Sequence, residues 1–387
     1  MKSGIIALAL SYILSQFFRS FLAVLAPSLA VDIGAQPDDL SRASAAFFLT
    51  FAAAQIPVGW SLDHFGPRRT ATLPFAVFAG GGALAVAFAQ TPLAIQIGMA
   101  LIGLGVAPTL MASYFIFLRT YSAAAFATLA GSIVGFGSLG NLFGTIPLAE
   151  AVETIGWRAA MQIVAGLTLL GAASIWLFVR DPERVEGQSA KGGFTELLRI
   201  RALWPVIVMI FVGYAPSISL RGVWMGPYLQ DTFGLATRQI GWATMAMALA
   251  MLIALVALGP LDRWLNRKKG LILTCAVISA VCFTLLPFAG SLTSAIVLFI
   301  VIGWTGSIYP LLVSHGIAFV PRHLTGRGTS LLNLFSIGGV SVLQWLAARL
   351  YHGSYTPVFL MFAGALAVGV VIYSFARLSK PESVKLS

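Results

Sequence analysis

The feature that most constrains this chain is a series of long apolar segments, separated by short stretches that hold most of the charged residues. A helix needs about 20 mainly apolar residues to cross the hydrocarbon core of a bilayer. Twelve segments of this kind lie between charged residues, Gly and Pro. They are approximately 4–30, 41–62, 70–90, 93–117, 123–148, 157–179, 203–226, 239–260, 270–289, 292–316, 327–348 and 356–377. The sequence therefore predicts an all-α polytopic membrane protein with twelve transmembrane helices.

The composition excludes a water-soluble enzyme. Hydrophobic residues make up 58% of the 387 residues and charged residues 10%, whereas soluble domains carry about 25% charged residues. We find no nucleophile–base pair, metal-ligand cluster or phosphate-binding loop, and therefore expect neither an enzyme nor a metal or cofactor. Cys275 and Cys282 lie in one apolar segment, and we interpret both as reduced packing residues.

The basic residues predict how the chain is oriented. If the N-terminus is cytoplasmic, 18 of the 24 Lys and Arg residues face the cytoplasm, 4 face outside and 2 lie within spans. Lys and Arg accumulate in cytoplasmic loops, so both termini are expected inside. We interpret the net charge of +11 as this topology signal, and expect no nucleic-acid partner. Short outside loops without an Asn-x-Ser/Thr sequon favour a bacterial inner-membrane protein, and we expect a monomer surrounded by lipid.

The chain is predicted to consist of two repeated halves. We place a six-span bundle at residues 1–180, a hydrophilic cytoplasmic linker at 181–202, and a second six-span bundle at 203–387. The halves repeat at an offset of about 200 residues, since Gly59 and Asp63 correspond to Gly259 and Asp262. A six-span unit used twice in parallel is typical of one class of secondary transporter.

Two motifs make the resemblance specific. The loop after the second span reads Gly59-x-x-x-Asp63-His64-x-Gly66-x-Arg68-Arg69, and Gly156-Trp157-Arg158 precedes the sixth. Both resemble sequences of the major facilitator superfamily. The resemblance implies two six-helix bundles that alternate access by a rocker-switch motion, with a substrate between them near the middle of the membrane.

The loop motif also predicts a gate on the cytoplasmic side. Asp63 can cap a helix or pair with a nearby arginine, and such a cluster can hold a gate closed. The alternative is a solvated loop that only sets topology. The candidate gating residues are Asp63, Arg68, Arg69, Arg119, Asp262 and Arg263.

Two arginines fall inside predicted spans, whereas all thirteen acidic residues map to loops or helix ends. Arg19 lies in the first span and Arg221 in the seventh, which are equivalent positions of the repeat. An arginine at the bilayer centre costs roughly 2.5–3.5 kcal/mol, so such residues usually face a polar cavity. Their neighbours repeat as well, because Tyr12-x-x-Ser15-x-x-x-Arg19 recurs as Tyr214-x-x-Ser217-x-x-x-Arg221. Each helix is therefore expected to present one polar stripe.

Two guanidinium groups that face one cavity would clamp an anion, since each presents a fork suited to a carboxylate or a phosphate. The sequence thus predicts a transporter of a small organic anion. The arrangement is similar to the organophosphate:phosphate antiporters, and the region from Phe17 to Gly66 also resembles the anion:cation symporter group. Further candidates to line the cavity are Gln16, Trp224, Asn141, Asn333, Trp304 and Tyr309.

Several alternatives stay open at this stage. The arginines can instead be satisfied by backbone carbonyls and polar side chains within the protein. A multispecific efflux pump for neutral or anionic amphipathic compounds is a second function, and a non-transporting receptor or assembly factor on the same scaffold is a third. Import or export, symport or antiport, and the coupling ion are not decided by the sequence.

Overall fold

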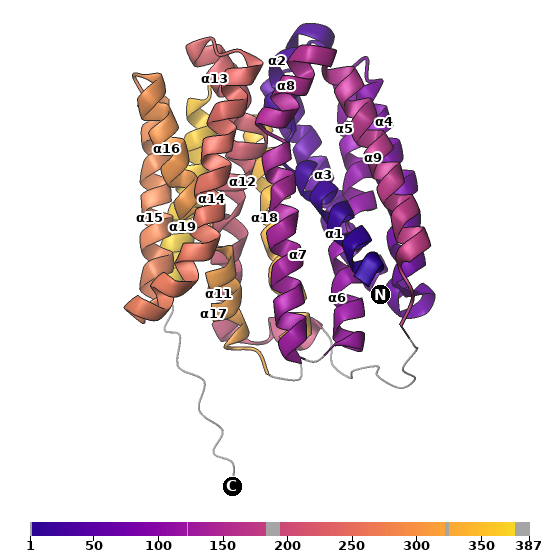
Figure 1. Ribbon diagram of the computed structural model, residues 1–387. Coiled ribbons are helices and arrows are strands. Elements are labelled where there is room, and N and C mark those ends of the chain that lie inside the picture. Colours follow the sequence, from indigo (N-terminus) through magenta and orange to yellow (C-terminus); the bar gives the residue numbers. More distant parts are fainter. Residues whose placement is uncertain (1, 122, 183–193, 322–324, 376–387) are drawn as a thin grey trace. The chain divides into compact units, whose positions relative to one another are not determined.

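The computed structural model describes residues 2–121, 123–182, 194–321 and 325–375, and throughout these ranges the chain is helical without a strand (Figure 1). Within them, eleven helices are long and apolar enough to cross a membrane. A bent pair, Ser3–Phe17 with Leu22–Ile33, forms the remaining span. The predicted all-α polytopic fold is thus confirmed.

The helices follow the predicted spans closely. Those before the predicted linker are α1 Lys2–Phe17, α2 Leu22–Ile33, α3 Pro37–Pro74, η1 Phe75–Gly80, α4 Gly81–Ala87, α5 Pro92–Val106, α6 Pro108–Thr120, α7 Ala123–Phe143, α8 Ile146–Ile155 and α9 Trp157–Phe178. Those after residue 193 are α10 Phe194–Leu198, η2 Arg201–Leu203, α11 Trp204–Gly213, α12 Ala215–Ser219, η3 Leu220–Trp224, α13 Met225–Phe233, α14 Thr237–Leu265, α15 Lys268–Leu285, η4 Leu286–Phe288, α16 Leu292–Thr305, α17 Tyr309–Ile317, α18 Thr325–Leu350 and α19 Thr356–Phe375. Several spans comprise two or more of these elements, because they bend or change helix type within the membrane.

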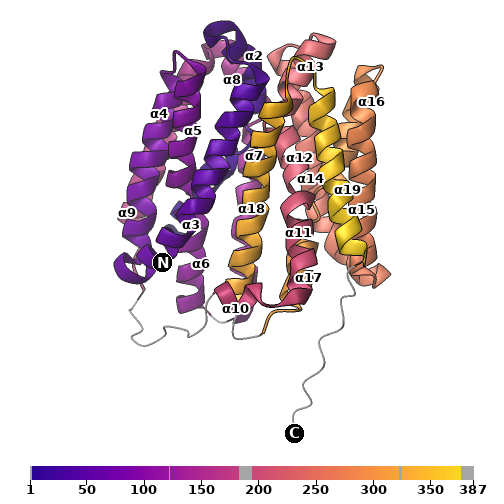
Figure 2. The same ribbon diagram turned by 180° about the vertical axis from the view of Figure 1, so that it is seen from behind.

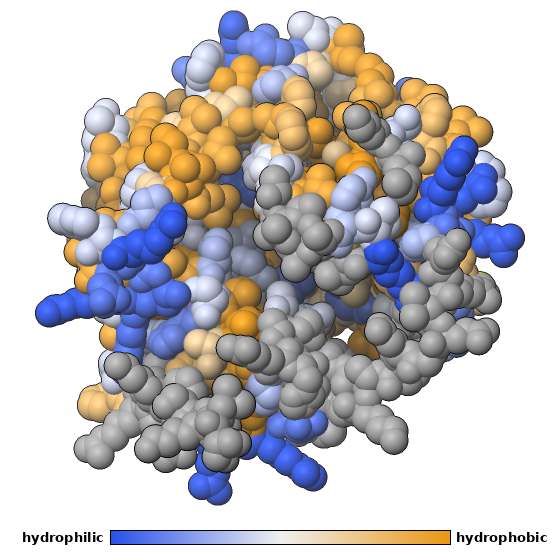
Figure 3. Space-filling model, turned by 60° about the horizontal axis from the view of Figure 1, so that its bottom comes forward, coloured by the Kyte–Doolittle hydropathy of each residue, from blue (hydrophilic) through white to orange (hydrophobic). Residues whose placement is uncertain are grey.

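The outward-facing sides of the helices are apolar. Large side chains such as Val256 (72% exposed) and Leu170 (67% exposed) would be unfavourable in water but match the hydrocarbon core of a bilayer. In Figure 3, which brings the lower end of Figure 1 forward, hydrophobic side chains lie mainly in the upper part of the view and many hydrophilic ones lie below them, at the end turned forward. This distribution is the one expected of a polytopic membrane protein.

The two spans that carry an arginine are both irregular at that residue. The first span bends by 52° between α1 and α2, and Arg19 lies in the break. In the seventh span Arg221 lies in η3, a short π-helix between α12 and α13. Short π-helical turns inside α-helices are frequent at functional sites, and transporters often build substrate sites from interrupted helices.

The chain divides into two compact units that differ from the predicted halves. The first unit contains the described residues of Met1–Glu186, Ser219–Ala248 and Gln344–His352. The second unit contains those of Gly187–Ile218, Leu249–Leu343 and Gly353–Ser387. Parts of three later spans are therefore grouped with the N-terminal helices. The division at 1–180, 181–202 and 203–387 stays a prediction, and residues 183–193 of its linker lie outside the described residues.

Within the first unit, α5 packs between α3 and α4, and α4 also contacts α9 (Figure 2). Close approach of these helices relies on small residues. A Cβ at Gly105, for example, would lie 2.1 Å from the Ala79 backbone nitrogen. The N-terminal helices thus form a dense scaffold for the first span.

Candidate substrate-binding site

Arg19 has no acidic ion-pair partner among the residues that the structure describes. Its guanidinium lies 4.7 Å from the centre of the Phe51 ring, which is a cation–π contact. Its Nε is buried, and no hydrogen-bond partner for it is found among the described residues. The side chain as a whole is only partly buried. A buried donor that lacks an acceptor is costly, so this arginine is suited to receive one from a ligand.

Arg221 is almost fully buried, with 3% of its surface exposed. Its Nη2 donates to Oδ1 of Asn141 on α7, at 2.9 Å. Both residues belong to the first unit, together with Arg19. The structure thus places three of the predicted site residues in one compact unit.

The two breaks lie against each other. A Cβ at Gly222, next to Arg221, would lie 2.8 Å from the carbonyl oxygen of Arg19. One turn further on, a Cβ at Gly226 would lie 1.8 Å from the carbonyl oxygen of Ala23. Pro27 has no N–H, so the Ala23 carbonyl has no helical i→i+4 partner and its oxygen can approach the glycine. Glycine is required at both positions, and the main chains at Arg19 and Arg221 are adjacent.

The polar stripe of the first span is present on α1. Gln16 Nε2 donates to the Tyr12 hydroxyl at 3.1 Å. Ser15 is fully buried, and its hydroxyl has no hydrogen-bond partner among the described residues. Gly137 of α7 packs directly against the Tyr12 ring. These side chains therefore lie on α1, just before the break that holds Arg19, and their contact with a substrate stays a prediction.

The matching stripe of the seventh span falls in the second unit. The Ser217 hydroxyl donates to the Ile302 carbonyl at 3.2 Å, and the Tyr214 ring lies 5.4 Å from that of Tyr309. Tyr309 in turn donates to Asn333 Oδ1 at 2.9 Å. Trp304 packs against the apolar core of this unit. Tyr214, Tyr309 and Asn333 thus contact one another in sequence. The role of these residues, of Ser217 and of Trp304 in binding is untested.

Trp224 belongs to a buried polar network that the sequence analysis missed. Its indole N–H donates to Gln344 Oε1 at 3.1 Å, and the Ser41 hydroxyl donates to the same oxygen at 2.6 Å. Gln344 Nε2 donates to the Ser44 hydroxyl at 3.2 Å. All four side chains are buried. A single amide thus connects α3, η3 and α18, and we call these four residues the Gln344 network.

The loop motif contains one partner that sequence reasoning did not identify. The Arg68 backbone N–H donates to Asp181 Oδ1 at 2.8 Å, and its side chain Nε donates to the Trp176 carbonyl at 2.6 Å. Gly66, with φ +78°, leaves room for the Asp181 carboxylate. The sequence signal that could have identified this partner is the position of Asp181, an acidic residue just after the sixth span. The side chain of Asp63 lies outside the described residues, so its role stays a prediction.

The other gating candidates are spread over both units. Arg69 is exposed, and Arg119 lies over the Phe115 ring at 4.2 Å. In the second copy of the motif, Asp262 pairs with Lys268 at 3.4 Å, while Arg263 is exposed. The gating function of all of them is likewise untested.

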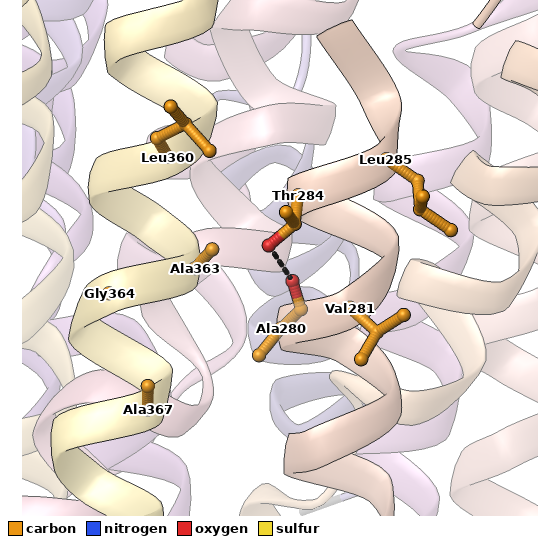
Figure 4. Close-up of a pocket in the computed structure, with 8 residues that line it drawn as sticks. All are labelled: Ala280, Val281, Thr284, Leu285, Leu360, Ala363, Gly364 and Ala367. Carbon is orange, nitrogen blue, oxygen red and sulfur yellow. Dashed lines mark hydrogen bonds between the residues drawn. The ribbon is translucent and has the colours of Figure 1, made fainter. Parts of the chain in front are cut away.

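A groove elsewhere in the second unit does not coincide with the arginines. It lies between α15 and α19, has a volume of about 410 Å³ and is lined by eight residues, of which only Thr284 has a polar side chain (Figure 4). The Thr284 hydroxyl donates to the Ala280 carbonyl of its own helix at 2.9 Å. A groove with no charged group cannot bind a small anion strongly, and it contains none of the candidate site residues.

Twelve spans, a repeated pair of interrupted helices and a buried cationic site define a polytopic membrane transporter. The chain belongs to the Major Facilitator Superfamily, whose family model matches residues 8–220 and 217–387. The predicted superfamily is thus confirmed, and the protein is a transporter rather than an enzyme.

The relatives agree with this assignment. The chain is 24% identical to the "Uncharacterized transporter YybO" of Bacillus subtilis, over 100% of this chain and 94% of that protein. It is 23% identical to the "Probable sulfoacetate transporter SauU" of Cupriavidus necator, over 68% of this chain and 65% of that protein.

Solved structures show the same fold. A D-xylose–proton symporter superposes with a TM-score of 0.77 at 15% identity, covering 97% of each chain. The nucleoside transporter NupG superposes with a TM-score of 0.73 at 16% identity, covering 97% of this chain and 98% of NupG. These similarities establish the fold and leave the substrate to be inferred from the site.

Proposed function

We propose that this protein is a secondary active transporter of a small organic anion, which Arg19 and Arg221 clamp between them. One observation carries the proposal: the described residues offer no acceptor to the buried Nε of Arg19, which lies directly beside the helix break that holds the buried Arg221. An anion that enters there supplies an acceptor for this Nε and a counter-charge together.

The energetics favour a ligand over a purely structural role. A charged group inside the membrane is expensive unless it is paired or solvated. Arg19 and Arg221 bring two such charges to adjacent, irregular helix breaks. The cost is offset when a carboxylate, phosphate or sulfonate accepts charge-assisted hydrogen bonds from both guanidinium groups.

One of the two relatives supports the same class of substrate. It is named as a probable sulfoacetate transporter. Sulfoacetate is a compact dianion that carries a carboxylate at one end and a sulfonate at the other. Two guanidinium groups provide one fork for each end, and we therefore propose a short substrate with one or two anionic groups.

The remaining features of the proposal concern transport itself. We infer a monomer in a bacterial inner membrane with both termini in the cytoplasm, and a rocker-switch motion of the halves 1–180 and 203–387. Contacts within the first unit already join helices from the two halves. Arg238 on α14 pairs with Glu150 on α8 at 2.6 Å, and the Gln344 network joins α18 to α3. These polar contacts can break and re-form as the halves move.

The binding experiment uses purified protein with sulfoacetate and its neutral analogue methylsulfonylacetamide. A ligand that binds the folded state raises the melting temperature, and calorimetry gives the affinity. We expect binding of the anion and little binding of the neutral analogue. Equal affinity for the two in the wild-type protein would refute the anion clamp. Stronger binding of neutral amphipathic compounds would favour the multispecific pump instead.

The topology is tested separately in cells. A cysteine introduced in place of Lys385 is expected to be protected from a membrane-impermeant maleimide added outside. Labelling of intact cells at this position would place the C-terminus outside and contradict the orientation.

A further inference from the structure

The helix that carries Asn141 is held tightly against the first span. A Cβ at Gly140 would lie 1.9 Å from the Ile13 carbonyl oxygen, and one at Gly144 would lie 2.5 Å from the Ser20 hydroxyl. The flanking glycines therefore let α7 pack in direct contact with the backbone around Arg19. The position of Asn141 is consequently fixed relative to the first span.

From this position Asn141 reaches the other arginine. Its Oδ1 accepts from Arg221 Nη2 at 2.9 Å, across the boundary between α7 and η3. The Asn141 side chain thus links α7, which packs against the first span near Arg19, to the guanidinium of Arg221 by a hydrogen bond. A planar guanidinium fork that is held at one nitrogen keeps a defined orientation for its other N–H groups.

The chemical nature of this contact matters as much as its geometry. An amide oxygen is a neutral acceptor, so it orients the guanidinium without cancelling its charge. A carboxylate at the same place would hold the fork equally well but would supply the negative charge that the substrate is meant to bring.

We propose that Asn141 is the specificity-determining positioning residue of the anion site. It orients Arg221 towards the substrate and, because it is neutral, does so without adding a counter-charge of its own. This inference rests on the proposed function and adds to it the residue that sets selectivity for anions over neutral compounds.

Two substitutions separate this role from a structural one. Asn141→Asp keeps the size and the acceptor but adds the charge, so it should strengthen the contact with Arg221 and raise the melting temperature. It should nevertheless lower the affinity for sulfoacetate by about tenfold or more, the scale of a lost charge-assisted contact. Asn141→Leu loses the hydrogen bond but leaves Arg221 charged, so it should lower the melting temperature and weaken binding only about threefold to tenfold. If Asn141 were needed only for folding, Asn141→Leu should lower the affinity for sulfoacetate more than Asn141→Asp does.

The matched control is Asn141→Asp in a protein from which the arginine at position 221 has been removed. In an Arg221→Gln background, Asn141→Asp should change sulfoacetate affinity by less than about twofold, because the two residues are in contact and the carboxylate acts through Arg221, so the two substitutions should not be additive. A full effect in that background would show that the new carboxylate acts on something other than Arg221, and would overturn the proposal.

The measurement is calorimetry of sulfoacetate and methylsulfonylacetamide on monodisperse protein, with melting temperatures recorded for each variant. The proposal is overturned if Asn141→Asp binds sulfoacetate as the wild type does, or if Asn141→Leu loses as much as Asn141→Asp. If Asn141→Asp does not fold, Asn141→Ser serves as the second variant. Asn141→Ser must keep the preference for the anion, and loss of that preference would overturn the proposal. Failure of the wild type to distinguish the two probes would instead refute the anion clamp itself.

Discussion

Replacing Gln344 by leucine should shift the protein towards a state in which α3, η3 and α18, the elements joined by the Gln344 network, are separated. The wild-type side chain accepts from Ser41 at 2.6 Å and Trp224 at 3.1 Å, and donates to Ser44 at 3.2 Å. Leucine has a similar volume, so the effect comes from hydrogen bonding rather than from a cavity. The Gln344→Leu protein should remain folded but should favour the state in which these helices are separated.

The free-energy cost of the substitution depends on which hydrogen bonds the three partners of Gln344 can still make in the variant. The Ser41 hydroxyl also contacts the backbone carbonyl of residue 344 at 2.7 Å, and this contact survives the substitution. The Ser44 hydroxyl can turn to a carbonyl of its own helix. The indole N–H of Trp224 loses its Gln344 acceptor in a fully buried site, which costs about 1–3 kcal/mol. The open state should therefore become about 5- to 150-fold more populated relative to the closed one.

The assay measures how often a buried position becomes accessible. Thr145 is 1% exposed, and its hydroxyl contacts Met245 Sδ of α14 at 3.5 Å. Thr145→Cys, in a protein with Cys275→Ala and Cys282→Ala, should react slowly with a maleimide and report each opening. Adding Gln344→Leu should raise the labelling rate by the same factor, about 5- to 150-fold, provided that the open and closed states exchange faster than the maleimide reacts.

The reasoning would be refuted by an unchanged labelling rate in folded Gln344→Leu protein. A further check is Trp224→Phe in the same background. Removing the donor as well as the acceptor should recover part of the lost energy, because the cost arises from an unsatisfied group rather than from the missing bond. If the free-energy changes of Gln344→Leu and Trp224→Phe simply added in the double variant, this explanation would be contradicted.

Three further predictions concern other parts of the structure. Arg19→Lys or Arg221→Lys should weaken sulfoacetate binding by about 1–3 kcal/mol in calorimetry, since lysine keeps the charge but loses the fork; unchanged affinity in both would argue against bidentate contacts. Gly226→Val should abolish folded yield in size-exclusion chromatography, because its Cβ would lie 1.8 Å from a backbone oxygen, whereas Gly131→Ala, with nothing within 4 Å, should not. Asp181→Asn should slow uptake into proteoliposomes while binding stays within about twofold, because its weakened contact with the Arg68 N–H is remote from the arginine site; a large loss of affinity would exclude a gating role.

The membrane fold was predictable because each span is a local property of the sequence. A span must be apolar and must satisfy its own backbone, so composition alone reveals it. The repeat of Arg19 in Arg221 was also visible, because it needs only two short segments and a common offset. The break at Arg19 was not, since the residues from Phe18 to Phe21 contain neither Gly nor Pro.

The partners of polar groups were the part that sequence could not supply. Gln344 is a single amide in an apolar segment, and its partner Ser41 lies 303 residues away. Nothing local distinguishes it from a residue that faces a substrate. Asp181 was missed for a related reason, since Asp63 in the loop motif already offered a nearby carboxylate for the same task. Hydrogen bonds between distant spans depend on helix packing, which periodicity does not encode.

The separation of 303 residues between Ser41 and Gln344 also bears on how the chain is made. Membrane helices are inserted in the order of synthesis, and domains generally fold N-terminal part first. The second span therefore enters the bilayer with its serine hydroxyls turned to its own carbonyls, long before their final partner exists. Trp224 arrives next, and the amide that unites them arrives only with the eleventh span. Assembly of the first unit is thus completed late in biogenesis, and a nascent chain stalled before residue 344 leaves that unit without the amide that joins α3 to η3.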